Sequence, residues 1–295
     1  MTIPSETFLT TREVAALLRI KERKVYDLVA KRQIPCTRAT GKLLFSKTAI
    51  DAWLTSTRSG PEAGSIESPL PNVILGSHDP LLDWALQESR CGLATQFGGS
   101  SDGLDRFAER GGVASSLHLY DPKADSWNIS EVQHRFKDQP VALVEFCWRE
   151  RGVIVKPEFQ TQIRSPADLK GLRLVQRQPG TGSEILLGCL FARDQIDMGS
   201  VSFTAQAHTE TEAASAVLED LADAALGLRA MAERFRLAFV PLMRERFDLI
   251  VNRKSWFDEP LQLLAEFCRS QEFKSKARSM PGYDASRFGR VHFNG

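Results

Sequence analysis

A stretch rich in serine, glycine and proline divides this chain into two parts. Residues 57–71 read TRSGPEAGSIESPLP and show almost no apolar periodicity. Because such a segment cannot bury enough apolar surface to fold, it predicts a linker. The sequence therefore predicts a small N-terminal domain over residues 1–56 and a larger domain over residues 72–295.

Charge follows the same division. The chain has a net charge of +1, yet residues 1–60 hold eleven Lys and Arg against five Asp and Glu, which leaves −5 for the rest. A basic module joined to a mildly acidic body is typical of a nucleic-acid-binding domain carried by a second domain. We therefore expect the N-terminal part to bind double-stranded operator DNA.

The composition indicates in which compartment the protein resides and whether it uses disulfides, metals or cofactors. No segment approaches the ~20 apolar residues of a membrane span, and the first residues lack the basic start and apolar run of a secretion signal. We expect a cytoplasmic protein that does not enter a membrane. The cysteines are odd in number and far apart, which disfavours disulfides and a zinc site. We expect no metal or cofactor and free thiols at Cys36, Cys91, Cys147, Cys189 and Cys268.

The basic part predicts three helices and a hairpin. Thr10 followed by Glu13 has the spacing of a capping box, so a first helix is expected to begin there. After a short break, residues 21–33 show a helical apolar stripe, and Pro35 is expected to end that helix. Residues 36–46 alternate as a two-stranded wing, and a last short helix closes the unit.

This part resembles the excisionase-type (MerR-like) winged helix-turn-helix over residues 9–54. The LT-x-x-EVA opening, the VY pair, the IP before the wing and the AIDAWL end carry the resemblance. It implies that the second helix enters the major groove while the first helix and the wing meet phosphates. A solvated face of a protein-binding module is the alternative. The candidate DNA-binding residues are Arg12, Lys21, Arg23, Lys24, Tyr26, Lys31, Arg38 and Lys42.

The larger part alternates short apolar runs with helical patterns, which predicts an α/β fold with a parallel sheet covered on both faces. Small and hydroxyl-bearing residues follow several predicted strands, at the ends where open α/β sheets bind ligands. Turns that merely reverse the chain are the alternative. The candidate ligand-binding residues are Ser77, His78, Asp79, Ser100, Ser101, His118, Arg177, Thr181, Gly182, Ser183 and Glu184.

The larger part also resembles the periplasmic-binding-protein-like (type II) domain of bacterial regulators. GSHDPLLDWAL, GGVASSLHLYD, RGVIVKP, DLKGLRLVQRQPGTGSEILL, LADAALGL and PGYDASRFGRV carry the resemblance. It implies two α/β lobes, with the chain crossing between them near residues 141–156 and 238–252, and a ligand in the cleft. Relatives in transport systems bind molybdate, tungstate and other small anions, so the resemblance implies an oxyanion or a small carboxylate as effector.

Two positions depart from this resemblance. Glu184 stands where the family has an arginine, and Thr209-Glu210 stands where it has a Thr-His pair, with His208 displaced. Each exchange places a carboxylate where a cation would balance an anion, which disfavours a strongly anionic ligand. Arg177 can pair with a bound oxyanion or with Glu184.

Three further residues allow two interpretations each. His118 lies at the end of a predicted strand, where it either contacts the ligand or packs beneath the cleft with a hydrogen bond of its own. Asp125 and Asn128 either reach the ligand rim or belong to a surface loop.

These features predict a ligand-responsive transcription regulator rather than an enzyme. His78, Asp79 and Ser100 offer a base, an acid and a hydroxyl, but adjacent side chains point to opposite faces and no GxSxG elbow is present. A homo-oligomer is expected, because one helix-turn-helix module binds weakly in salt. The alternatives are a regulator with a degenerate cleft governed by a partner protein, and a recombination directionality factor.

Overall fold

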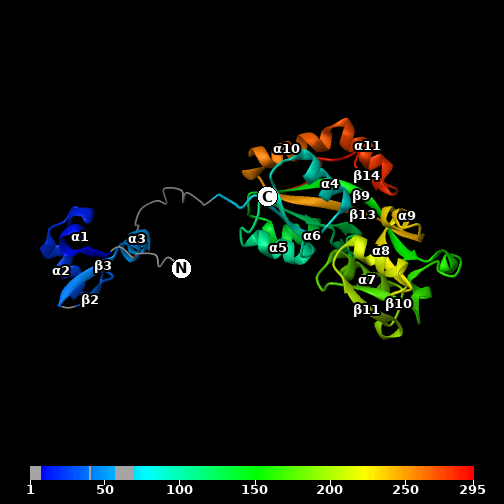
Figure 1. Cartoon of the computed structure of the whole chain (residues 1–295), viewed down its shortest axis with the longest axis horizontal. Coiled ribbons are helices and arrows are strands. Elements are labelled where there is room, and N and C mark those ends of the chain that lie inside the picture. The colour runs from blue at the N-terminus through cyan, green and yellow to red at the C-terminus, as the bar shows by residue number, and fades with distance from the viewer. Residues whose placement is uncertain (1–7, 40, 57–68) are drawn as a thin grey trace. The chain divides into compact units, whose positions relative to one another are not determined.

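The computed structural model describes residues 8–39, 41–56 and 69–295. Contacts divide the chain into two compact units, Met1–Ser68 and Pro69–Gly295, each with its own hydrophobic core (Figure 1). In the described segments, no helix combines the length and the apolar character needed to cross a membrane.

The described part of the N-terminal unit has three helices and three strands, one strand more than the sequence predicts. The additional strand, β1, pairs with β3, so the expected hairpin becomes an antiparallel sheet in the order β1-β3-β2. Val14, Val25, Phe45 and Ile50 form the centre of its core. The elements are β1 (Phe8–Thr10), α1 (Thr11–Leu18), α2 (Glu22–Ala30), β2 (Thr37–Ala39), β3 (Lys42–Ser46) and α3 (Lys47–Ser56).

The ends of α1 and α2 follow from local chemistry. Thr10 Oγ1 accepts a hydrogen bond from Glu13 N at 3.3 Å, and the Glu13 carboxylate accepts one from Thr10 N at 2.7 Å, which confirms the predicted capping box. The expectation that Pro35 ends the second helix is wrong. The helix already ends at Ala30, because Arg32 takes a left-handed backbone conformation with φ 55°.

One ten-stranded sheet runs through the larger unit in the order β11-β10-β12-β9-β13-β6-β4-β5, with β14 and β15 also paired to β9. It is mixed rather than wholly parallel, because β9 and β13 cross the unit in opposite directions and pair antiparallel. The strands are β4 (Val73–Gly76), β5 (Ala94–Gln96), β6 (Ala114–Leu117), β9 (Val141–Val155), β10 (Arg173–Arg177), β11 (Ser202–Ala207), β12 (Ala224–Leu228), β13 (Ala238–Asn252), β14 (Tyr283–Asp284) and β15 (Val291–Asn294). A separate pair joins β7 (Tyr120–Asp121) to β8 (Ser126–Trp127).

Helices cover this sheet in two groups (Figure 1). One lobe, built on β4, β5 and β6, has a core that includes residues of α4, α10 and α11 and another that includes residues of α5 and α6. The second lobe, built on β10, β11 and β12, has cores that include residues of α7, α8 and α9. The helices are α4 (Pro80–Ser89), α5 (Ser100–Ala108), α6 (Ile129–Phe136), α7 (Gly182–Arg193), α8 (Glu210–Leu218), α9 (Arg229–Arg234), α10 (Glu259–Arg269) and α11 (Gln271–Ser279).

The long strands β9 and β13 connect the two lobes. At one end β13 pairs with β6 of the first lobe, and at the other end β9 pairs with β12 of the second. Between these ends the two strands remain hydrogen-bonded to each other, with register shifts at Pro241/Met243 and Phe247/Asp248. The middle of this ribbon therefore lies where the two lobes meet.

Candidate functional site

The predicted DNA-binding residues all lie on the exposed surface of the N-terminal unit. Lys24 on α2 and Lys31 directly after α2 both pair with Asp27, at 3.3 Å each, so part of their charge is already balanced. Arg23, on the same helix, has no ion-pair partner among the described residues. Arg23 is therefore the side chain of α2 best able to reach a base edge.

A hollow of about 540 Å³ gathers four of these residues from separate elements. Arg12 comes from α1, Tyr26 from α2, and Arg38 and Lys42 from the two strands of the wing. Tyr26 is 52% exposed and has a hydroxyl that can donate to an anion. Cations on facing walls of a hollow suit a phosphate group, so this surface fits a nucleic-acid backbone.

In the larger unit, the turn after β4 is held by buried hydroxyl and carboxylate contacts. Asp79 caps α4 by accepting hydrogen bonds from Leu81 N and Leu82 N, both at 2.9 Å. Ser77 Oγ lies 2.7 Å from Ser100 Oγ, which also accepts a hydrogen bond from the backbone of His118 at 3.2 Å.

The facing turn of the second lobe is arranged around Glu210. Thr181 Oγ1 caps α7 by accepting from Glu184 N at 3.3 Å. Ser183 Oγ donates to Glu210 Oε1 at 3.3 Å, and Arg177 Nη1 donates to the same oxygen at 3.1 Å. The carboxylate of Glu210 thus accepts hydrogen bonds both from Ser183 in the first turn of α7 and from Arg177 at the end of β10.

The two lobes are in direct contact at these turns. Ser101 N donates to Gly180 O at 3.2 Å. A Cβ atom at Gly182 would lie 2.5 Å from the carbonyl oxygen of His118, so only glycine fits there. The two lobes therefore touch at these two turns.

Behind the turns lies a buried cluster of charges, which we call the interlobe junction: Asp79, Arg149, Arg151, Arg177, Glu210 and Glu245. Arg149 Nη1 donates to Asp79 Oδ2 at 2.6 Å and Arg149 Nε to Glu245 Oε1 at 2.8 Å. Arg151 bridges two carboxylates, donating to Glu245 Oε2 and to Glu210 Oε1, each at 3.0 Å. Three arginines therefore face three carboxylates.

The ionisation of the junction follows from this pairing. Burial alone would raise the pKa of Glu210, but Arg151 and Arg177 hold it well below its usual range. Burial would likewise raise the pKa of Glu245, but the charges of Arg149 and Arg151 lower it, and the net result is a pKa well below the usual range. Burial lowers the pKa of His118, although its Nδ1 lies 2.9 Å from Glu245 Oε2. At neutral pH the junction is therefore charge-balanced without a ligand.

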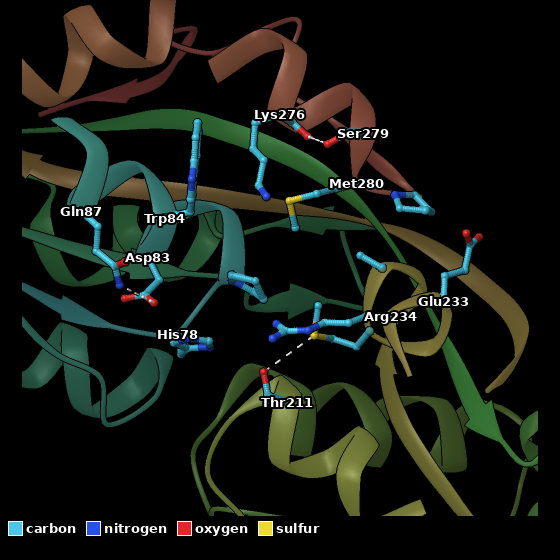
Figure 2. Close-up of a pocket in the computed structure, with 14 residues that line it drawn as sticks. His78, Asp83, Trp84, Gln87, Thr211, Glu233, Arg234, Lys276, Ser279 and Met280 are labelled. Atoms are coloured by element: carbon cyan, nitrogen blue, oxygen red, sulfur yellow. Dashed lines mark hydrogen bonds between the residues drawn. The ribbon is translucent and has the colours of Figure 1, made fainter. Parts of the chain in front are cut away.

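A pocket of about 590 Å³ lies beside the junction, between α4 and α11 of the first lobe and α8 and α9 of the second (Figure 2). Trp84, Met231 and Met280 give it an apolar wall, and Arg234 and Lys276 give it charge. His78 also lines it, and its Nδ1 is buried without a hydrogen-bond partner in the part of the chain that the structure describes.

Comparison with known proteins identifies both units. A model of the PBP superfamily domain matches residues 84–269, which is more than half of the chain. The chain belongs to the PBP superfamily. A helix-turn-helix domain model matches residues 8–58, ahead of this PBP domain. The family resemblances of both parts are thereby confirmed.

Among individual proteins, the chain is 26% identical to the uncharacterized protein YvgK of Bacillus subtilis (strain 168), over 96% of each chain. The PBP domain superimposes on the regulatory domain of MetR, a LysR family regulator from N. meningitidis, with TM-score 0.51 and 13% identity, covering 72% of this chain and 96% of that one. A putative phosphate transporter substrate-binding protein from Clostridium perfringens gives TM-score 0.50 and 12% identity, covering 74% and 98%. These likenesses show the fold alone.

The PBP domain brings together most of the residues predicted to bind ligand. Ser77, Asp79, Ser100, His118, Arg177, Thr181, Gly182 and Ser183 lie at or against the junction. Ser101 takes part through its backbone, and His78 faces the neighbouring pocket. Glu184 is exposed, and its carboxylate accepts a hydrogen bond from Gly180 N at 3.3 Å.

Two of the open alternatives are decided. Arg177 pairs with Glu210, so the alternative pairing with Glu184 is wrong. Asn128 is 2% exposed and bonds Leu119 N and Asp248, whereas Asp125 accepts from the Tyr120 hydroxyl. Asn128 is therefore a buried structural residue and not part of a surface loop.

The five cysteines are free, as expected.

Sequence reasoning missed Arg149, Arg151 and Glu245. A signal was present, because each predicted crossing segment contains the tripeptide Arg-Glu-Arg, at residues 149–151 and 244–246. The two tripeptides are antiparallel neighbours, with Arg149 opposite Glu245. Alternation along the strands puts Arg149, Arg151 and Glu245 on one face, which is the face of the junction.

A second buried acid lies near the first lobe's end of β13. Asp248 accepts from Arg246 Nε at 2.8 Å and from Asn128 Nδ2 at 2.8 Å, and it stands opposite Glu145 on β9. Burial raises the pKa of Asp248 to about 7, although Arg246 opposes this shift. The protonated form of Asp248 is therefore favoured in the folded state.

This shift predicts a pH-dependent stability. Because the folded pKa of Asp248 exceeds the unfolded value, its contribution is complete at low pH and is lost as pH rises through about 7. Between pH 6 and pH 8 the wild type should lose about 1.4 kcal/mol relative to Asp248→Asn, as measured by urea unfolding of both proteins. A constant difference between the two proteins would contradict the assignment.

Proposed function

We propose that this chain is a transcription regulator whose helix-turn-helix domain binds operator DNA in response to a small molecule bound by the PBP domain. The observation that carries the proposal is the presence of both domains in one chain. The hollow lined by Arg12, Tyr26, Arg38 and Lys42 supports DNA binding, since its cations come from the helices and the wing together.

The proposed mechanism uses the interlobe junction as the switch. In the closed form the charges are balanced and the lobes touch. An effector that binds one arrangement of the lobes better than another shifts the population toward it, by no more than its difference in affinity. The change in lobe arrangement then alters DNA binding. We further propose a homo-oligomer, so that two or more helix-turn-helix domains contact successive half-sites.

A test of the DNA interface uses one substitution in α2. Arg23→Ala should lower affinity for a selected operator by about 1–3 kcal/mol, roughly five- to 150-fold, because a base-reading arginine is lost. The operator is first obtained by selecting genomic fragments on the purified full chain. Affinity is then measured by fluorescence anisotropy at fixed salt, since affinities at different salt concentrations are not comparable.

Lys47→Ala is the matched control, because Lys47 is an exposed cation at the start of α3 outside the predicted DNA-binding set. Its affinity should stay near that of the wild type. Equal losses in the two variants would indicate a general charge effect, and no loss in Arg23→Ala would exclude α2 as the recognition helix.

The identity of the effector is a separate proposal. Molybdate, tungstate and small carboxylates are candidates, and a thermal-shift screen of the full chain ranks them because a bound ligand raises the melting temperature by mass action. One observation favours a second candidate function. Glu210 already neutralises Arg151 and Arg177, as expected for a regulator whose cleft no longer binds anions and which a partner protein controls.

A further inference from the structure

The pocket beside the junction contains two cations whose contacts in the described residues are with aromatic rings, Lys276 over Trp84 and Arg234 over Phe235. Arg234 and Lys276 form no ion pair with any residue that the structure describes. Of the acids in the same pocket, Glu233 forms an ion pair with Arg229 Nε at 2.9 Å, whereas Asp83 accepts from the neutral amide of Gln87 at 3.2 Å and keeps its charge. Arg234 and Lys276 therefore outnumber the one pocket carboxylate that has no cationic partner among the described residues.

Figure 2 shows where these cations point. Lys276 extends from α11 toward the centre of the pocket, and Arg234 extends from α9 toward the same space from the other lobe. The two charges thus lie on opposite walls, one in each lobe. An anion bound to both cations would contact both lobes at once.

The remaining wall is apolar and includes an aromatic ring. Trp84 is half-buried, packs against Phe267 at 5.4 Å between ring centroids, and has Lys276 Nζ 5.4 Å from its own ring centre. Met231 and Met280 line the same space from α9 and the end of α11. Thioethers and an indole favour contact with a flat apolar or aromatic group. A volume of about 590 Å³ lies within the usual range for small organic ligands.

The pocket adjoins the junction through the chain itself. His78 lines the pocket and precedes Asp79, which binds Arg149. Thr211 lines the pocket and follows Glu210, which binds Arg151. A ligand that displaced His78 or Thr211 would therefore move a carboxylate of the junction.

Resting on the proposed regulator function, we infer that the effector is an aromatic carboxylate that binds in this side pocket and not at the junction. Its carboxylate lies between Arg234 and Lys276, and its ring packs against Trp84 and the two methionines. His78 also lines this pocket, and its buried Nδ1 has no partner among the described residues. A bare oxyanion would leave the apolar wall without a contact.

Isothermal calorimetry on the full chain tests this inference, with benzoate and indole-3-carboxylate as probes. Each should bind at least tenfold more tightly than its neutral amide, because the amide lacks the charge that Arg234 and Lys276 require. Acetate, which lacks the ring, should also bind at least tenfold more weakly. Equal affinities for acid and amide, or no binding of either aromatic acid, would overturn the inference.

Variants locate the site. Arg234→Gln and Lys276→Gln should each weaken binding of the aromatic acids at least fivefold, whereas Lys274→Gln, an exposed cation on the same helix, should leave it unchanged. Unchanged binding in both pocket variants would place the ligand elsewhere.

The outcomes also separate this inference from the proposed function. Binding of molybdate or sulfate without the aromatic acids would overturn the ligand class while leaving a ligand-responsive regulator. Operator affinity that no bound compound changes would overturn the ligand response itself.

Discussion

Replacing Glu210 by alanine is expected to cost about 3–5 kcal/mol of unfolding free energy, because it leaves buried arginine charge unpaired. Glu210 is 2% exposed and is the carboxylate that joins Arg151 to Arg177. Removing it opens a space lined by both guanidinium groups and the Ser183 hydroxyl. Urea unfolding of the variant and the wild type measures the loss.

The same variant should gain a binding site for a small anion. Arg177 Nε, which has no partner in the described part of the chain, adds a donor to that space. Formate at tens of millimolar should therefore return part of the lost stability to Glu210→Ala and none to the wild type. Glu184→Ala is the control, because Glu184 is exposed, and its cost should stay within about 0.5 kcal/mol. Equal costs in the two variants, or formate acting equally on both, would show that Glu210 does not occupy an anion site.

Gly182→Ala should keep the lobes from closing. The added methyl group would lie 2.5 Å from the His118 carbonyl oxygen and 2.6 Å from its Cε1, so the first turn of α7 must move away from the first lobe. Overpacking of this kind costs about 3 kcal/mol. We expect that loss in urea unfolding together with a larger radius of gyration in small-angle X-ray scattering.

The control for this prediction lies on the same helix. Gly188 has open space around the position of a Cβ, so Gly188→Ala should stabilise α7 by about 0.5–1 kcal/mol and leave the radius of gyration unchanged. A Gly182→Ala protein with the stability and size of the wild type would mean that the lobes do not close through this contact.

Sequence patterns predicted a helix or strand well where residues close together in the chain decide its geometry. Thr10 and Glu13 give the capping box, because caps depend only on neighbours in the chain. β1 escaped prediction, since Phe8–Thr10 is short and becomes a strand only by pairing with β3. Its hydrogen bonds come from residues about 36 positions away, which no local pattern reports.

The turns of the candidate site were predicted, but the charged residues on its two long strands, Arg149, Arg151 and Glu245, were not. Small residues after strands indicated Ser77, Ser100 and Thr181, because these lie at strand ends in any such fold. Arg149 and Arg151 lie inside β9, where a buried charge is costly unless a partner is present. Their partner Glu245 is 94–96 positions away, and only the register of β9 against β13 brings the three together.

The ribbon of β9 and β13 has a mechanical consequence. Because the two strands are continuous through both lobes and bonded to each other, the lobes cannot swing about a loop, and any relative rotation must twist the ribbon. The register shifts at Pro241/Met243 and Phe247/Asp248 flank a regularly paired stretch of β13, and Glu245 lies at the centre of that stretch. Twisting that stretch would shear Glu245 against Arg149. The torsional stiffness of the molecule is thus set by the same ion pairs that balance its buried charge.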